Sequence, residues 1–187
     1  MRFTLHYRGR LKSAASPVDK QALRRHFHVQ LCRLWNETPL TAFQEFLKPN
    51  ADPGSLSAIT EANGFQFAHL ICERLGTVAE LEVLLLWPQP PGAIVSAGGD
   101  IDNRLKTLFD ALRAPREATA LPTGEAPRGD DEVPFFVLLE DDRLITRVTV
   151  ETAQLLEPST DPAEVELWLR VRVRQVRTMM GTLGLTS

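Results

Sequence analysis

Apolar and polar residues alternate in several stretches of the chain, most regularly near its end. From Val165 to Val173 every second residue is Val or Leu, while the residues between them are Glu, Trp and Arg. A period of two indicates a strand with one buried face. Residues 2–8 alternate in the same way and predict a strand at the N-terminus. Apolar runs predict further strands at residues 65–71, 79–87, 135–139 and 144–152.

Two segments show helical rather than alternating spacing. Ser16 followed by Pro17 is typical of a helix start, and apolar residues recur at helical intervals from there to about residue 36. A second apolar stripe predicts a helix over residues 101–113, and a weaker pattern predicts a short helix at 42–47. We therefore predict an α/β (α+β) fold. It is a single domain over residues 1–187, with a small mixed β-sheet and helices packed on one face.

Two segments lack any regular pattern. Residues 114–134 are rich in Pro, Gly and charged residues, which predicts a long, mobile surface loop inserted into the domain. Residues 178–187 contain glycine and small polar residues and predict a frayed tail.

Composition places the chain among ordinary globular proteins. Hydrophobic residues make up 43% and charged residues 24%. The longest apolar run, at residues 81–87, is much shorter than the roughly 20 residues that cross a bilayer. The N-terminus lacks the pattern of a secretory signal, so we expect a cytoplasmic protein without membrane contact. The net charge of −3 argues against nucleic-acid binding unless arginines gather locally.

Carboxylates gather in two places that begin or end predicted elements. Asp100 and Asp102 stand at the start of the helix predicted over 101–113, and Asp141 and Asp142 follow a predicted strand. Taken singly, these residues are typical helix caps and turn residues. If they converge instead, two carboxylates about 5 Å apart repel by roughly 3 kcal/mol at an effective dielectric near 20. Oxygen-only ligands favour hard cations, so convergence would indicate a Mg²⁺ or Mn²⁺ site.

The order of these motifs resembles the RusA-like Holliday junction resolvases, a family of small metal-dependent endodeoxyribonucleases often carried by prophages. The resemblance rests on D-x-D-N-x-x-K at residues 100–106, F-D-A-L at 109–112, and an apolar strand that ends in Asp141-Asp142 and is followed by an alternating strand. These motifs cover about a quarter of the chain, and the looser order of elements covers most of it.

The resemblance implies a hydrolase that cuts DNA in recombination and repair. Asp100, Asp102 and Asp142 would hold Mg²⁺ (Mn²⁺ possible), Asp141 would assist them, and Lys106 would act in catalysis. The resemblance also implies a homodimer whose two sites cut opposing strands of a four-way junction.

Arginines near these motifs and on the last predicted strand are candidates for DNA contact. They are Arg104, Arg143, Arg147, Arg170, Arg172 and Arg174. The row on the last strand is also consistent with charges that protect an exposed strand face.

The leading hypothesis is a Mg²⁺-dependent, structure-selective DNA endonuclease that acts on branched or duplex DNA. The main alternative is a non-catalytic module that keeps the fold and binds nucleic acid or a protein partner. A structural subunit of a phage complex is a third option, for which no residue pattern speaks directly.

Overall fold

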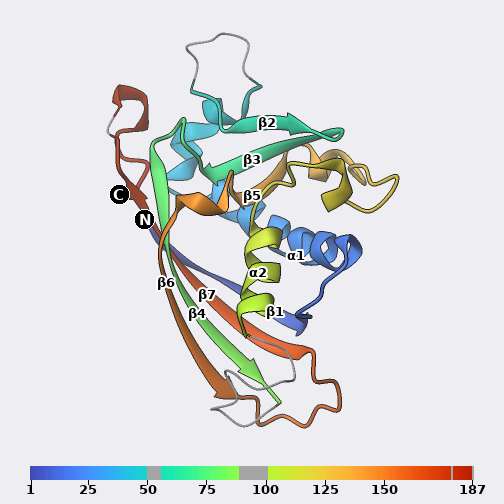
Figure 1. The fold of residues 1–187 in the computed structure, drawn as a ribbon. Coiled ribbons are helices and arrows are strands. Elements are labelled where there is room, and N and C mark those ends of the chain that lie inside the picture. The colour runs from blue at the N-terminus through green and yellow to red at the C-terminus, as the bar shows by residue number, and fades with distance from the viewer. Residues whose placement is uncertain (50–55, 89–100, 178, 187) are drawn as a thin grey trace.

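The chain forms an α+β fold, which confirms the predicted class, and its strands form two mixed sheets. The structure is a computed structural model that describes residues 1–49, 56–88, 101–177 and 179–186 (Figure 1). The helices are α1 (Pro17–Trp35) and α2 (Ile101–Leu112), with a 3-10 helix at Leu40–Leu47. The strands are β1 (Arg2–Arg10), β2 (Ile59–Ala62), β3 (Phe65–Ile71), β4 (Thr77–Trp87), β5 (Phe135–Leu139), β6 (Ile145–Gln154) and β7 (Glu164–Gln175).

The strands divide between two sheets, and the prediction of a single sheet was wrong. The larger sheet has the order β1-β7-β4-β6, with β6 parallel to β4 and the other neighbours antiparallel. The smaller sheet has the order β2-β3-β5, with β3 and β5 parallel. The chain changes sheets in the tight bend between β3 and β4. There Gly76 adopts a positive φ of 62°, and the Thr77 hydroxyl accepts a hydrogen bond from the Cys72 N–H.

The chain crosses from the smaller to the larger sheet a second time, between β5 and β6, beside the first crossing. The chain leaves β5, passes through the short 3-10 helix Asp142–Leu144, and enters β6 in the larger sheet. The Glu140 N–H donates to the Ile71 carbonyl, and the Glu73 N–H donates to the Glu140 carboxylate. Both changes of sheet are therefore tied together, and the Asp141-Asp142 pair lies at the junction of the two sheets.

Helix α1 begins where the sequence predicts, at a capping box formed by Ser16 and Asp19. Its apolar side buries Leu23, Phe27 and Trp35 in the core, and the helix packs against β5, α2 and β1. In Figure 1 both helices lie on the same side of the larger sheet. The core fills the space between that side and the helices, whereas no helix among the described residues covers the sheet's other face.

The hairpin formed by β2 and β3 was not predicted. Asn63 and Gly64 connect the two strands, and both have positive φ, 53° and 82°. A two-residue hairpin turn needs this geometry, which Asn-Gly adopts more readily than most pairs. The Asn-Gly pair was therefore the available signal for β2.

The 114–134 segment lies on the surface, but its contacts do not fit a free, mobile loop. Arg25 on α1 forms ion pairs with Glu125 at 2.6 Å and with Glu132 at 2.7 Å. Leu121 is buried among the phenylalanines of β3 and β5. Two largely buried ion pairs and an apolar anchor therefore hold the segment against the domain.

The predicted frayed tail packs against the domain as well. Leu185 is fully buried in the main core, and Thr182 is buried beside it. The Gln175 side-chain amide donates to the Thr182 hydroxyl. An apolar residue that returns to the core thus overrides the weak local pattern of residues 179–186. No helix in the described part of the chain is long and apolar enough to cross a membrane.

Candidate functional site: a charged groove along α2

Helix α2 buries one side and borders a groove with the other. Ile101, Leu108 and Leu112 pack into the core. A groove of about 400 Å³ is lined by Asp102, Leu105, Lys106, Phe109, Asp110, Arg113 and Asp142. The residues from α2 and its end recur at intervals of three and four, so they form one stripe along the helix. Asp142 comes from the distant junction between β5 and β6.

Three charged side chains in this groove have no partner among the residues that the structure describes. Within the described part of the chain, Asp102, Lys106 and Asp142 make no side-chain hydrogen bond or ion pair. By contrast, the Asp110 carboxylate accepts from Lys20 Nζ at 2.6 Å and from Arg113 at 3.0 Å. The groove thus combines a satisfied ion-pair cluster with three charges that no other described residue neutralises.

The Asp110 cluster fixes the end of α2. Burial acts to raise the pKa of Asp110, but hydrogen bonds from Lys20 and Arg113 outweigh it and lower the pKa below its ordinary value. Arg24, a buried residue of α1, donates to the backbone carbonyls of Asp110 and Arg113. These carbonyls lie in the last turn of α2 and just after it, and would otherwise lack partners.

The two adjacent aspartates at the sheet junction have different roles. Asp141 is buried, accepts a hydrogen bond from the Arg143 N–H at 2.9 Å, and lies in ion-pair contact with the guanidinium of Arg116. It caps the 3-10 helix Asp142–Leu144 and does not line the groove. Asp142 is exposed and lines the groove. The prediction that Asp141 assists a metal is therefore not supported by its contacts, which are those of a structural cap.

Asp100, the fourth predicted ligand, lies outside the described residues. Among the residues that are described, no three His, Cys, Asp or Glu side chains are grouped so as to hold a metal ion. Asp102 and Asp142 supply only carboxylate oxygens to the groove, and such donors suit Mg²⁺ or Mn²⁺ rather than softer metals. The donor chemistry in the groove therefore fits the predicted ion.

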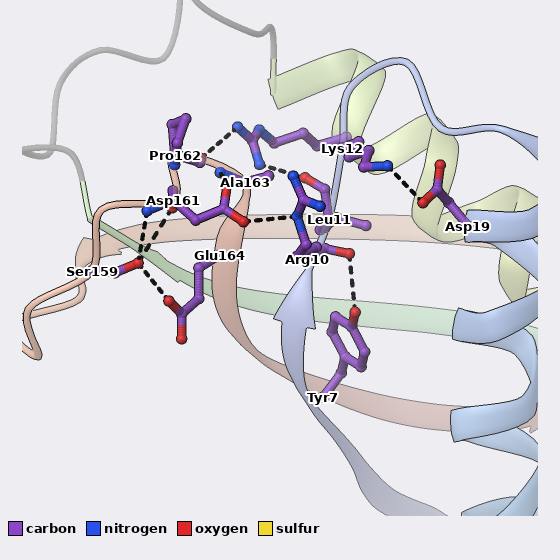
Figure 2. Close-up of polar contacts among 11 residues, drawn as sticks. Tyr7, Arg10, Leu11, Lys12, Asp19, Ser159, Asp161, Pro162, Ala163 and Glu164 are labelled. Carbon is purple, nitrogen blue, oxygen red and sulfur yellow. Dashed lines mark hydrogen bonds and ion pairs between the residues drawn. The ribbon is translucent and has the colours of Figure 1, made fainter.

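Arg104 does not belong to a DNA-contacting surface, because its side chain is buried. Its guanidinium donates to the carbonyls of Leu11 and Pro162 and lies 5.5 Å from the centre of the Trp87 ring. Figure 2 shows these two carbonyls beside the ion pair of Arg10 and Asp161, which has a length of 2.7 Å. Arg104 thus joins α2 to the loop after β1 and the loop before β7. Its burial lowers its pKa.

The other predicted arginines are exposed, but they do not converge on the groove. Arg143 forms an ion pair of 2.9 Å with Glu73 at the sheet junction. Arg170, Arg172 and Arg174 project from β7 on the face turned away from the core, and Arg147 on β6 lies on the same face. Sequence reasoning also overlooked Trp168, an exposed aromatic residue in this row.

Comparisons with models of protein families, with curated proteins and with solved structures found no match.

Proposed function

We propose that this chain is a Mg²⁺-dependent endonuclease that cuts branched or duplex DNA by hydrolysis. The observation that carries the proposal is the groove itself. It brings Asp102 and Lys106 of the D-x-D-N-x-x-K motif together with Asp142, and none of the three has a partner among the described residues. Unpaired charges of both signs beside one another suit a ligand with a metal cation and a phosphate.

Each charged side chain of the groove would have a separate role in the reaction. Asp102 and Asp142, together with Asp100, would hold the ion through carboxylate oxygens. When bound, Mg²⁺ supplies Lewis acidity toward the phosphodiester and lowers the pKa of a bound water. The Lys106 ammonium would stabilise negative charge that develops on the phosphate oxygens. The Asp110 cluster would keep α2, and with it Asp102 and Lys106, in place.

The test is cleavage of labelled DNA with Mg²⁺ or Mn²⁺. The substrates are a four-way junction, a flap, a nicked duplex and a linear duplex. We expect wild type to cut the branched substrates and Asp102→Asn or Asp142→Asn to lose at least about 100-fold in rate. Lys106→Met should lose about 100- to 1,000-fold. Asp130→Asn, the same change at an exposed site on the 114–134 segment, is the matched control and should cut like wild type.

Wild type that cuts no substrate, or Asp102→Asn that cuts as fast as wild type, would refute the endonuclease. The alternative function, a non-catalytic binding module, draws support from the arginines on the open sheet face. Calorimetry with Mn²⁺ distinguishes the two, because only a metal-dependent nuclease should show binding that Asp102→Ala removes.

The resemblance also leads us to propose a homodimer. Sedimentation equilibrium of the wild-type chain should then give twice the 20.9 kDa chain mass. A monomer at micromolar concentration would exclude paired cutting of opposing strands by a preformed dimer.

A further inference from the structure

The uncovered face of the larger sheet carries side chains from all four of its strands. Strand pairing places Arg2, Arg172, Glu80 and Arg147 side by side in one row across β1, β7, β4 and β6. The neighbouring row contains Arg170 and Glu82, and Arg174 lies beyond Arg172 on β7. We call these seven charged residues the arginine face.

The arginine face is strongly positive on a chain that is negative overall. Five guanidinium groups face two carboxylates there, an excess of three positive charges, whereas the net charge of the chain is −3. Glu80 forms ion pairs with Arg172 and Arg174 at 3.4 and 2.8 Å. Arg2 and Arg147 make no side-chain ion pair or hydrogen bond with another described residue. A hollow of about 360 Å³ lies between the rows.

An exposed aromatic pair continues this face. Trp168 is 41% exposed, and the ring of His6 on β1 lies 4.3 Å from it, centroid to centroid. A second hollow, of about 470 Å³, lies beside the indole and is lined by Leu84, Thr149 and Arg170 among others. An exposed aromatic ring therefore lies next to a row of guanidinium groups, each of which can pair with a phosphate group.

We propose that this face binds single-stranded nucleic acid, with the arginines on the phosphates and a base stacked on Trp168. Single strands present both a charged backbone and unstacked bases, and proteins that bind them combine a basic groove with aromatic platforms. The bases of a duplex are already stacked and cannot reach Trp168. Glu82 and Glu151, which line the second hollow, would repel a phosphate and a peptide carboxylate alike. The exposed indole makes the difference, because an acidic peptide could pair with the arginines but has no bases to stack on Trp168.

This face is separate from the groove along α2, because the arginines project away from the core into which α2 packs. The proposal therefore goes beyond the proposed cleavage and does not depend on it. A single strand held there would tether a branched substrate while the groove acts on another part of it.

The test is binding of labelled oligothymidylate and oligouridylate in buffer with EDTA, where metal-dependent cleavage cannot occur. Tryptophan fluorescence gives a direct readout, because Trp35 and Trp87 are buried and Trp168 is the exposed tryptophan. We expect both oligonucleotides to quench it. Trp168→Ala should weaken binding on the order of 10-fold or more, and Trp168→Phe should recover most of that loss.

Arginine variants test the phosphate contacts. Arg147→Ala should lower the slope of log affinity against log salt by about 0.7, the value for one phosphate contact of a single strand. Arg33→Ala, at an exposed position on α1, is the matched control and should leave the slope unchanged. Asp102→Asn should bind as wild type does, so loss of cleavage and loss of this binding are measured independently.

Three results would overturn the proposal. The first is oligonucleotide binding that is the same in Trp168→Ala, with equal thermal stability of the two proteins. The second is duplex DNA that binds as tightly as the single-stranded oligonucleotides. The third is displacement of a bound oligonucleotide by polyglutamate added at the same concentration of negative charge. A preference for only one of the two oligonucleotides would support the proposal, and oligodeoxyuridylate would then show whether the sugar or the thymine methyl group is recognised.

Discussion

Lys20 Nζ lies 2.6 Å from the Asp110 carboxylate, and this ion pair joins α1 to α2 at the edge of the candidate groove. Both side chains are mostly buried, with exposures of 25% and 17%. The pair therefore links the helix that carries Lys106 to the rest of the domain.

Breaking this pair should destabilise the domain. We expect Asp110→Asn and Lys20→Met each to lower the free energy of unfolding by about 1–2 kcal/mol. The double variant should show a coupling energy of about 1 kcal/mol, measured by urea denaturation in a double-mutant cycle. Additive effects of the two substitutions would show that the pair contributes nothing as a pair.

The same pair predicts a dependence on acid. Because the pKa of Asp110 is lowered in the folded chain, its stabilising effect is present above the ordinary carboxyl pKa. That effect should disappear as the pH falls through the lowered value. Lys20→Met should therefore lose less stability than wild type between pH 4 and 2, measured by denaturation at each pH.

Arg104 should matter for stability and not for DNA affinity. Removing its buried guanidinium leaves the Leu11 and Pro162 carbonyls without partners, so Arg104→Met should cost about 2–3 kcal/mol of unfolding free energy. Arg147→Met, at an exposed site, should stay within about 0.5 kcal/mol of wild type. Equal stability of the two variants would contradict the buried role of Arg104.

The C-terminal segment should contribute to the core. Leu185→Ala removes a fully buried side chain and should cost about 2–5 kcal/mol, measured by thermal or chemical unfolding. Leu183→Ala, two positions earlier, changes a side chain that is 59% exposed and should cost less than about 0.5 kcal/mol. Similar small losses for both would indicate that this segment is frayed in solution.

His69 should make folding sensitive to mild acid. The Leu139 carbonyl can only accept, so the His69 Nδ1 carries the hydrogen that it donates at 3.3 Å. Its Nε2 then accepts from the Thr60 hydroxyl at 2.6 Å, which requires a neutral ring. Burial lowers the pKa of His69 to about 4.

Protons therefore bind first to the unfolded chain as the pH falls. The neutral His69 therefore contributes its full stabilisation above pH 6.5, the approximate pKa of histidine in the unfolded chain. This contribution, about 3 kcal/mol, should be lost as the pH falls from 6.5 to about 4. His69→Asn cannot titrate and keeps a donor for Leu139. It should be less stable than wild type at pH 7, and the gap should narrow steadily down to pH 4. A constant gap would contradict a neutral His69.

Local patterns predicted most elements because each depends on neighbours in the chain. The capping box at Ser16 and the alternation in β7 are complete within a few residues, and both elements form as predicted. The single-sheet prediction failed because the bend at Gly76 assigns β3 and β4 to different sheets, and alternation does not say which strands pair. β2 is four residues long and left only its Asn-Gly turn as a signal.

In the candidate site too, the sequence determined some features and the tertiary structure determined others. Asp102 and Lys106 lie four residues apart on one helix, so the sequence alone determined that they share a face. Tertiary structure decided that Asp142 joins them, that its neighbour Asp141 turns inward to Arg116, and that Arg104 is buried. Where the chain reverses, the side chains of neighbouring residues face different directions. The packing of distant segments then determines which of these side chains reaches the groove.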